Sequence, residues 1–299
     1  MQARYIFMSA CEASGDRLGA ELIQEIKSQW QNKYELHFIG VAGPLMRAAG
    51  CIAILSQESL AIMGFWEVLK HLKFLLRQRR SVQDFALALR PTVYIGLDAP
   101  DFNLAIESVL KKAGIRTVHV NSPTLWAWRP GRIHKIKKAV DLMLTLFPFE
   151  PAFYTPYNIK AKFIGHPLAD RLPLEPYSNR ARCTLGIPLT APVLTLMPGS
   201  RRQEIHHLGS LFLQVAHACQ EALPNLHILV PMSDHVSLEY FRSLANRWPQ
   251  LKLHITLGKA HDMLQACDGV LVASGTATLE AMLCKKPMVI SYRMDKLSY

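Results

Sequence analysis

Short apolar runs alternate along this chain with segments whose apolar residues recur at helical spacing. In the first part of the chain, the runs typical of buried strands are 5–9, 36–39, 93–97, 117–120, 142–146 and 162–164. Between them lie amphipathic patterns such as Leu18, Leu22, Ile23 and Ile26, which fall on one face of a helix. This alternation predicts a parallel sheet whose strands are joined by helices.

The same alternation begins again after a proline-rich stretch at 167–176. The second set of expected strands is 193–197, 226–230, 253–255, 270–272 and 288–290. Two such series in tandem predict an α/β fold with two Rossmann-like parallel-sheet domains that face a cleft. The boundary is expected in a linker near residues 165–180, which gives domains 1–167 and 168–299.

Composition and charge narrow the class of protein. A chain of 299 residues with 50% hydrophobic content can bury two cores, and its six cysteines lack the spacing of a metal site. The first apolar run is too short for a signal peptide, and no window approaches the ~20 apolar residues of a membrane-spanning helix. A cytoplasmic protein, soluble or peripheral to a membrane, is expected. Its net charge of +11 favours anionic partners, and nucleic acid, acidic phospholipid and phosphorylated substrates all remain open.

Candidate chemistry gathers where strands end, which is where parallel α/β sheets bind ligands. The turn "SACEASGD" combines small residues with a helix start, so Ser14 and Asp16 are candidate substrate-binding residues. A plain helix N-cap is the alternative for either side chain. The turn is not GxGxxG, which weakens a dinucleotide-binding interpretation.

The stretch "GLDAPDFN" places two carboxylates after a buried strand. Asp98 stands at the tip of the strand, where it could accept a proton from a substrate hydroxyl, and it is the candidate catalytic residue. Asp101 follows a proline and is predicted to be the N-cap of the next helix.

Two turns in the second half resemble phosphate-binding turns. In "LMPGSRRQEI", Gly199 allows a close backbone approach, Ser200 can donate a hydrogen bond and Arg201 can bind a diphosphate. Glu204, in the helix expected next, is a further candidate substrate-binding residue. A surface arginine pair after an ordinary turn is the alternative.

The other turn is "LVASGTATLEAM". Ser274, Gly275 and Thr276 open a helix, and Glu280 lies one turn along, placed to bind a ribose. Without a Walker A loop or an acidic cluster, a metal or cofactor is not expected. A diphosphate neutralised by arginine and helix N-termini points to a nucleotide-sugar transferase.

The segment "MGFWEVLKHLKFLLRQRR" carries an apolar stripe beside basic residues at helical spacing. This combination is typical of a helix that lies on an anionic membrane surface. An amphipathic helix packed on its own core is the alternative. The candidate membrane residues are Phe65, Trp66, Val68, Leu69, Leu72, Leu75 and Leu76.

Eight blocks in order along the whole chain resemble the lipid-A-disaccharide synthase family. They are "SACEASGD", "MGFWEV", "GLDAPDFN", "SPTLWAWRPGRI", "FPFEPAFY", "FIGHPLAD", "MPGSRRQEI" and "ASGTATLEAMLCKKPMVISYRM". The resemblance implies a GT-B fold and an enzyme peripheral to the inner face of the inner membrane of Gram-negative bacteria.

The resemblance also implies the reaction. UDP-2,3-diacylglucosamine would donate its sugar to 2,3-diacylglucosamine 1-phosphate, giving a β(1→6) disaccharide 1-phosphate and UDP. Because the donor is α-linked and the product is β-linked, the displacement would be inverting and would need one base. A homodimer is a candidate assembly.

The chain departs from the family pattern in places. Cys11 and Ala42 replace usual glycines, and Asn121 replaces a usual apolar residue. Family members continue for about 80 residues beyond the Arg-Met block, so the second domain is expected to be incomplete.

Rival functions remain on the sequence alone. Trp126 and Trp128 beside basic residues could stack on nucleic acid, but that hypothesis leaves the turns at Arg201 and Thr276 unexplained, so no nucleic acid is expected. A UDP-sugar epimerase on the same fold needs neither an acceptor nor a membrane helix. A dehydrogenase is weaker, because GxGxxG is absent.

Overall fold

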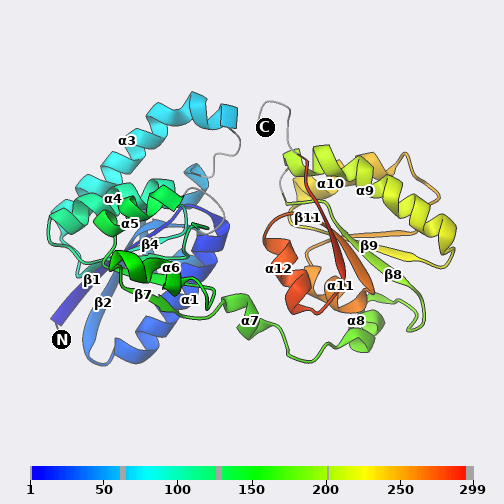
Figure 1. Cartoon of the computed structure of the whole chain (residues 1–299), viewed down its shortest axis with the longest axis horizontal. Coiled ribbons are helices and arrows are strands. Elements are labelled where there is room, and N and C mark those ends of the chain that lie inside the picture. The colour runs from blue at the N-terminus through cyan, green and yellow to red at the C-terminus, as the bar shows by residue number, and fades with distance from the viewer. Residues whose placement is uncertain (1, 61–64, 126–129, 201, 294–299) are drawn as a thin grey trace. The chain divides into compact units, whose positions relative to one another are not determined.

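The computed structural model describes residues 2–60, 65–125, 130–200 and 202–293 (Figure 1). The chain divides into two compact units, Met1–Pro167 and Leu168–Tyr299. Each unit is an α/β layer structure built on one parallel sheet.

The sheet of the first unit has seven strands in the order β3-β2-β1-β4-β5-β6-β7, and every neighbouring pair is parallel. Six of the strands coincide with predicted runs, and β3 was not predicted. The strands are β1 (Gln2–Ala10), β2 (Tyr34–Ala42), β3 (Cys51–Ser56), β4 (Val93–Leu97), β5 (Thr117–Val120), β6 (Leu142–Thr145) and β7 (Ala161–Phe163).

Helices cover both faces of this sheet because successive strand residues point to opposite sides. On one face Ile6 and Met8 pack with Ile23 of α1, and on the other Phe7 packs with Val82 of α3 and Ile106 of α4. The helices are α1 (Ala13–Trp30), α2 (Pro44–Ala48), η1 (Gln57–Ser59), α3 (Phe65–Leu89), α4 (Pro100–Lys112), η2 (Pro130–Arg132), α5 (Ile133–Ala139), α6 (Pro151–Tyr154) and η3 (Thr155–Tyr157).

The second unit repeats the plan with five parallel strands in the order β10-β9-β8-β11-β12. Helices α9 and α10 cover one face, and α8, α11 and α12 cover the other. The elements are α7 (Pro167–Arg171), α8 (Ser178–Leu185), β8 (Val193–Met197), α9 (Arg202–Ala222), β9 (His227–Met232), α10 (His235–Ala245), β10 (Leu253–Leu257), α11 (Ala260–Ala266), β11 (Gly269–Ala273), α12 (Thr276–Leu283) and β12 (Met288–Ser291).

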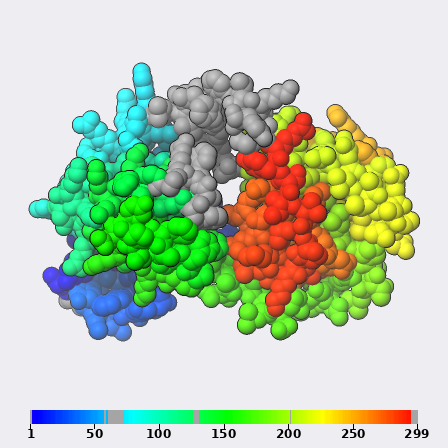
Figure 2. Space-filling model, viewed as in Figure 1, coloured from blue at the N-terminus to red at the C-terminus, as the bar shows by residue number. Residues whose placement is uncertain are grey.

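The border of the second sheet at β12 is apolar. Val289 and Ile290 are 66% and 55% exposed, and Met282 of α12 is 57% exposed. In Figure 2, β12 lies in the red surface and α12 in the orange-red surface beside it. β12 is the last strand in the order and therefore an edge strand among the described residues, and the helices that normally cover both faces of a parallel sheet leave it partly exposed.

Each sheet has one point where the strand order reverses. In the first sheet β1 lies between β2 and β4, and in the second β8 lies between β9 and β11. Connections leave such neighbouring strands toward opposite faces and open a crevice at their carboxyl ends. The topology therefore brings the predicted turn at Ser14 beside Asp98, and the turn at Gly199 beside Ser274.

Candidate functional site

Ser14 and Asp98 are in contact at the carboxyl ends of β1 and β4. The register pairs Ala10 with Leu97, so the turns that follow these residues leave the sheet side by side. The Ser14 hydroxyl donates a hydrogen bond to Oδ2 of Asp98 at 3.4 Å. The N-cap of α1 is Glu12, so Ser14 lies inside the first turn, where the N-terminal end of the helix favours a nearby carboxylate.

The backbone at Asp98 is left-handed. Asp98 has φ 58° and Ala99 has φ 43°, a conformation that costs non-glycine residues roughly 1–2 kcal/mol each. Oδ1 of Asp98 accepts the N–H of Ala99 at 2.9 Å. This turn directs the carboxylate toward Ser14, and non-glycine residues held in such a conformation cluster at functional sites.

The prediction that Asp101 caps α4 is wrong. The N-cap position is Ala99, because the left-handed turn ends the strand early and Pro100 occupies the first helical position. Asp101 lies in the first turn and forms an ion pair with Arg132 at 2.8 Å, with its side chain 85% exposed.

Asp16 is buried and fixes another helix. Its carboxylate is 2% exposed and accepts the backbone N–H groups of Gly43 and Leu45 at 2.9 Å and of Met46 at 3.0 Å. The carboxylate thereby holds the start of α2, and a side chain at Gly43 would collide with it. A substrate-binding role for Asp16 stays a prediction, and its observed contacts are those of a structural residue.

A buried polar network lies beneath Asp98. We call it the Asp98 cluster and define it as Ser9, Tyr94, Asp98, Asn103, Glu107 and His119. The Asn103 amide donates to the carbonyl oxygens of Asp98 at 2.8 Å and Ser9 at 3.2 Å, and it accepts the Tyr94 hydroxyl at 3.0 Å. Asn103 stands in "GLDAPDFN", but nothing in that stretch of sequence predicts these bonds.

The deeper part of the Asp98 cluster occupies space left by Gly96. Ser9, Gly96 and His119 are register partners across β1, β4 and β5, so their side-chain positions form a row on one face. Nδ1 of His119 lies 2.8 Å from Oε1 of Glu107, and both side chains are 0% exposed. A Cβ at Gly96 would overlap this pair. Among the described residues, the other ring nitrogen of His119 and the other oxygen of Glu107 have no hydrogen-bond partner.

Burial keeps two neighbouring groups neutral. Desolvation raises the pKa of the Cys11 thiol to about 12, and it raises the pKa of Tyr94 well above the ordinary value for tyrosine. Neither group can therefore serve as a base near neutral pH. Asp98 itself is half-buried, so a ligand can reach its carboxylate.

In the second unit, the turn at Gly199 is closed by its own helix. Gly199 has φ 118°, and a Cβ there would overlap Glu204. The N–H of Ser200 donates to Oε2 of Glu204 at 3.0 Å. Glu204 thus fixes the turn from within α9, and Ser200 is exposed beside it. Arg201 lies outside the described residues.

The turn at Ser274 leads into α12 from an exposed position. The N–H of Ser274 donates to the carbonyl of Ser291 at 2.9 Å, and Gly275 is the N-cap. Ser274, Gly275 and Thr276 are all exposed. Glu280 is half-buried, and its Oε2 lies 3.6 Å from Nε2 of His261. Small exposed residues at this helix start leave room for an anionic ligand.

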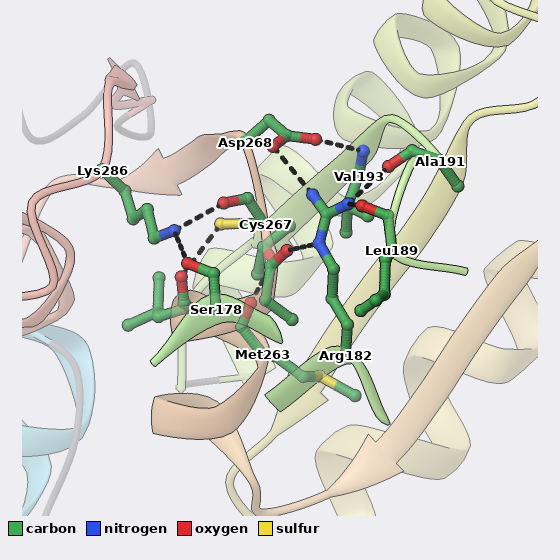
Figure 3. Close-up of polar contacts among 12 residues, drawn as sticks. Ser178, Arg182, Leu189, Ala191, Val193, Met263, Cys267, Asp268 and Lys286 are labelled. Carbon is green, nitrogen blue, oxygen red and sulfur yellow. Dashed lines mark hydrogen bonds and ion pairs between the residues drawn. The ribbon is translucent and has the colours of Figure 1, made fainter. Parts of the chain in front are cut away.

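A second polar network lies at the amino ends of β8 and β11, opposite the turns at Gly199 and Ser274 (Figure 3). It was not predicted from the sequence. We call it the Arg182 cluster: Ser178, Arg182, Asp268 and Lys286 with the backbone groups they bind. Arg182 donates to the carbonyls of Leu189, Ala191 and Ala266 and to Asp268 at 2.8 Å. Asp268 accepts the N–H of Val193 at 2.9 Å, and Lys286 bridges Ser178 and the Cys267 carbonyl. The cluster joins α8 to the amino ends of β8 and β11.

The predicted membrane stripe is only partly visible. The side chains of Phe65, Trp66, Val68, Leu69 and Leu72 lie outside the described residues. Leu75 packs against the core of its own unit, as the alternative interpretation of this helix expected, whereas Leu76 is 42% exposed. In the part of the chain that the structure describes, no helix is both long and apolar enough to cross a membrane.

Comparison with known proteins gives one consistent family. The family model described as lipid-A-disaccharide synthetase matches residues 6–299. The lipid-A-disaccharide synthase of Xylella fastidiosa strain M12 is 46% identical over 301 residues, which cover 100% of this chain and 77% of the relative. That of Haemophilus influenzae strain Rd is 46% identical over 295 residues, covering 98% of this chain and 75% of the relative.

Solved structures share the fold at low sequence identity. The calicheamicin glycosyltransferase CalG4 superposes with a TM-score of 0.59 at 16% identity, covering 97% of this chain and 79% of that one. A UDP-GlcNAc 2-epimerase from Neisseria meningitidis bound to UDP-GlcNAc gives 0.61 at 12% identity, covering 97% and 82%. These neighbours establish a GT-B fold.

Proposed function

Because the chain belongs to the lipid-A-disaccharide synthase family, a family of glycosyltransferases of lipid A biosynthesis, we propose the specific reaction that it catalyses. UDP-2,3-diacylglucosamine donates its sugar to 2,3-diacylglucosamine 1-phosphate. The products are a β(1→6)-linked disaccharide 1-phosphate and UDP.

Asp98 is the proposed general base. It takes the proton of the acceptor 6-hydroxyl as that oxygen attacks the anomeric carbon of the donor, and UDP leaves from the opposite side. The observation that carries this assignment is the left-handed turn that holds a half-buried carboxylate beside Ser14 at the strand-order reversal of the first sheet. An inverting displacement needs this one base and no enzyme nucleophile.

The donor is proposed to bind the second unit. Ser200, Arg201 and the exposed Ser274–Thr276 turn would hold the diphosphate, and Glu280 would bind the ribose. The strand-order reversal at β8 and the exposed helix start at Thr276 support this proposal. Titration calorimetry with UDP is the direct measurement, and an intact chain that does not bind UDP would contradict it.

The acceptor is acylated, so a membrane location on the cytoplasmic face of the inner membrane is proposed with it. The first part of α3 would lie on an anionic lipid surface, supported by the exposed Leu76 and the basic residues that follow it. Replacing Leu69, Leu72 and Leu76 by serine should release the protein from vesicles that contain phosphatidylglycerol. A triple variant that loses its cooperative melting transition instead would show that the stripe is core.

The test of the reaction uses Asp98→Asn, with Asp101→Asn as its control. Removal of a general base lowers rates by about 10²–10⁴-fold, so Asp98→Asn should bind UDP and melt normally while forming disaccharide at least about a hundredfold more slowly. Asp101→Asn loses only an exposed ion pair and should keep its rate. If the two variants behave in the opposite way, Asp98 is the wrong carboxylate.

Product analysis in the same assay separates the proposal from its rivals. Equal amounts of disaccharide and UDP indicate transfer, whereas an isomerised UDP-sugar without acceptor consumption would indicate an epimerase. Binding to arbitrary oligonucleotides without binding to UDP would indicate a nucleic-acid-binding protein.

A further inference from the structure

Asn103 uses both ends of its side-chain amide in hydrogen bonds beneath Asp98. The side chain is 0% exposed on the first turn of α4, and Nδ2 donates to the carbonyl of Ser9 at the end of β1 and to that of Asp98 after β4. Its Oδ1 accepts a hydrogen bond from the Tyr94 hydroxyl, so the amide oxygen lies toward Tyr94 and the amide nitrogen toward the two carbonyls. The two strand ends that carry the candidate site are therefore tied together by one side chain.

These bonds decide where the carboxylate of Asp98 points. The N–H of Asp98 donates to the carbonyl of Val120 at 3.0 Å, so β5 holds one peptide group and Asn103 holds the next. Between two fixed peptide groups the left-handed φ of Asp98 cannot relax. Since Oδ1 is occupied by the N–H of Ala99, the direction of Oδ2 toward Ser14 follows from the backbone.

We propose that Asn103 is a positioning residue for the general base: it locks the left-handed Asp98–Ala99 turn, with Tyr94 holding the amide. This inference rests on the proposed function of Asp98. It differs from a purely structural role, because a structural residue would lower the stability of the unit without acting through one carboxylate.

The experiment is a double-mutant cycle of Asn103→Ala and Asp98→Asn, measured as kcat with the folded fraction determined by thermal melting. Misplacing a reacting group by about 1 Å can cost roughly a hundredfold, so Asn103→Ala should lower kcat by about 10–100-fold with little change in KM for the donor. In the Asp98→Asn background the same change should lower kcat no further. Equal factors in both backgrounds, or a normal kcat for Asn103→Ala, would overturn the proposal.

Two more variants keep the test decisive if Asn103→Ala does not fold. Tyr94→Phe keeps the ring stacked on Phe7 and removes only the hydroxyl bound to Asn103, so a several-fold loss of kcat that also disappears with Asp98→Asn is expected. An unchanged kcat in Tyr94→Phe would argue against the proposal even if Asn103→Ala fails to fold. Gln265→Ala is the matched control, because Gln265 is a fully buried amide in the second unit and should change stability alone.

The outcomes also separate this proposal from the one on which it rests. If Asp98→Asn alone keeps its rate, the proposed base is wrong whatever Asn103 does. If Asp98→Asn is slow and Asn103→Ala is not, the base stands and Asn103 does not position it.

Discussion

The Arg182 cluster and the Asp98 cluster are both polar networks that tie strands of a parallel sheet to a helix around a buried side chain, Arg182 in one and Asn103 in the other. They differ in how completely they are bonded. In the Arg182 cluster the guanidinium reaches three carbonyls and a carboxylate, and that carboxylate also accepts the N–H of Val193. In the Asp98 cluster, one oxygen of Glu107 and one ring nitrogen of His119 have no partner among the described residues.

Their positions in the fold explain the difference. The Arg182 cluster lies at the amino ends of β8 and β11, where parallel α/β sheets do not bind ligands. The Asp98 cluster lies at the carboxyl ends of β1 and β4, and it also contains a left-handed aspartate. The bonded guanidinium of Arg182 stabilises the fold, whereas the Asp98 cluster combines unmet polar atoms with backbone strain at the end of the sheet that is available for chemistry.

The largest effect is expected from Arg182→Met, which keeps the aliphatic stem and removes every bond of the guanidinium. Three carbonyls lose their donor, so the free energy of unfolding of the second unit should fall by about 4 kcal/mol. Urea unfolding, with hydrogen exchange at β8 to identify the unit, measures this. Arg242→Met removes an exposed ion pair with Glu239 and should cost less than about 1 kcal/mol. Similar losses of stability in the two variants would show that the Arg182 cluster stabilises the fold no more than an exposed ion pair does.

A smaller effect is expected from breaking the Glu107–His119 pair. Glu107→Met or His119→Leu leaves the other polar group buried alone and should cost about 3 kcal/mol. The double variant should recover most of that loss, because an apolar pair of similar volume removes both unmet polar groups. Urea unfolding measures these losses as well. If the double variant loses as much free energy of unfolding as the two single variants together, the polar pair itself stabilises the unit and an apolar pair cannot replace it.

The smallest effect is expected from Ala99→Gly. Glycine relieves the left-handed φ of 43° but is more flexible in the unfolded chain, so the net gain in stability should be about 0.5–1 kcal/mol. Because the turn also becomes less rigid, kcat should fall a few-fold while the melting temperature rises. Ala20→Gly, inside α1, should lower the melting temperature, since glycine costs about 1 kcal/mol in a helix. If the melting temperature falls in Ala99→Gly as it does in Ala20→Gly, the backbone at Ala99 is not strained.

Much of the fold could be predicted from the sequence because the strands are continuous apolar runs separated by helices. Such a pattern allows few topologies. Because parallel α/β sheets bind ligands at the carboxyl ends of their strands, the turns at Ser14, Asp98, Gly199 and Ser274 could be picked out as candidate binding turns. β3 was missed because a short run such as Cys51–Ser56 carries no period of its own to tell strand from loop.

The roles of individual polar residues were harder to predict. Asp101 looked like an N-cap because capping is a local rule, but the left-handed turn at Asp98 moved the start of α4 and is not visible in the sequence. The partners of Asp16 lie 27 to 30 positions away, and Arg182 binds Asp268 across 86 positions. Bonds of this kind are created by the tertiary fold, and one sequence without its relatives gives no signal for them.

Gly96 has a consequence for how this site can vary by mutation. It carries no reactive atom, and a Cβ at this position would overlap the buried Glu107–His119 pair. Every substitution adds at least one carbon to a space that these two side chains already fill. In a saturation screen for growth, Gly96 should therefore tolerate fewer replacements than Ser14, which belongs to the candidate site and is exposed. The least variable position of the site would then be a residue without a chemical role. A ranking of residues by how few replacements they tolerate would place Gly96 ahead of residues proposed to act on the substrate.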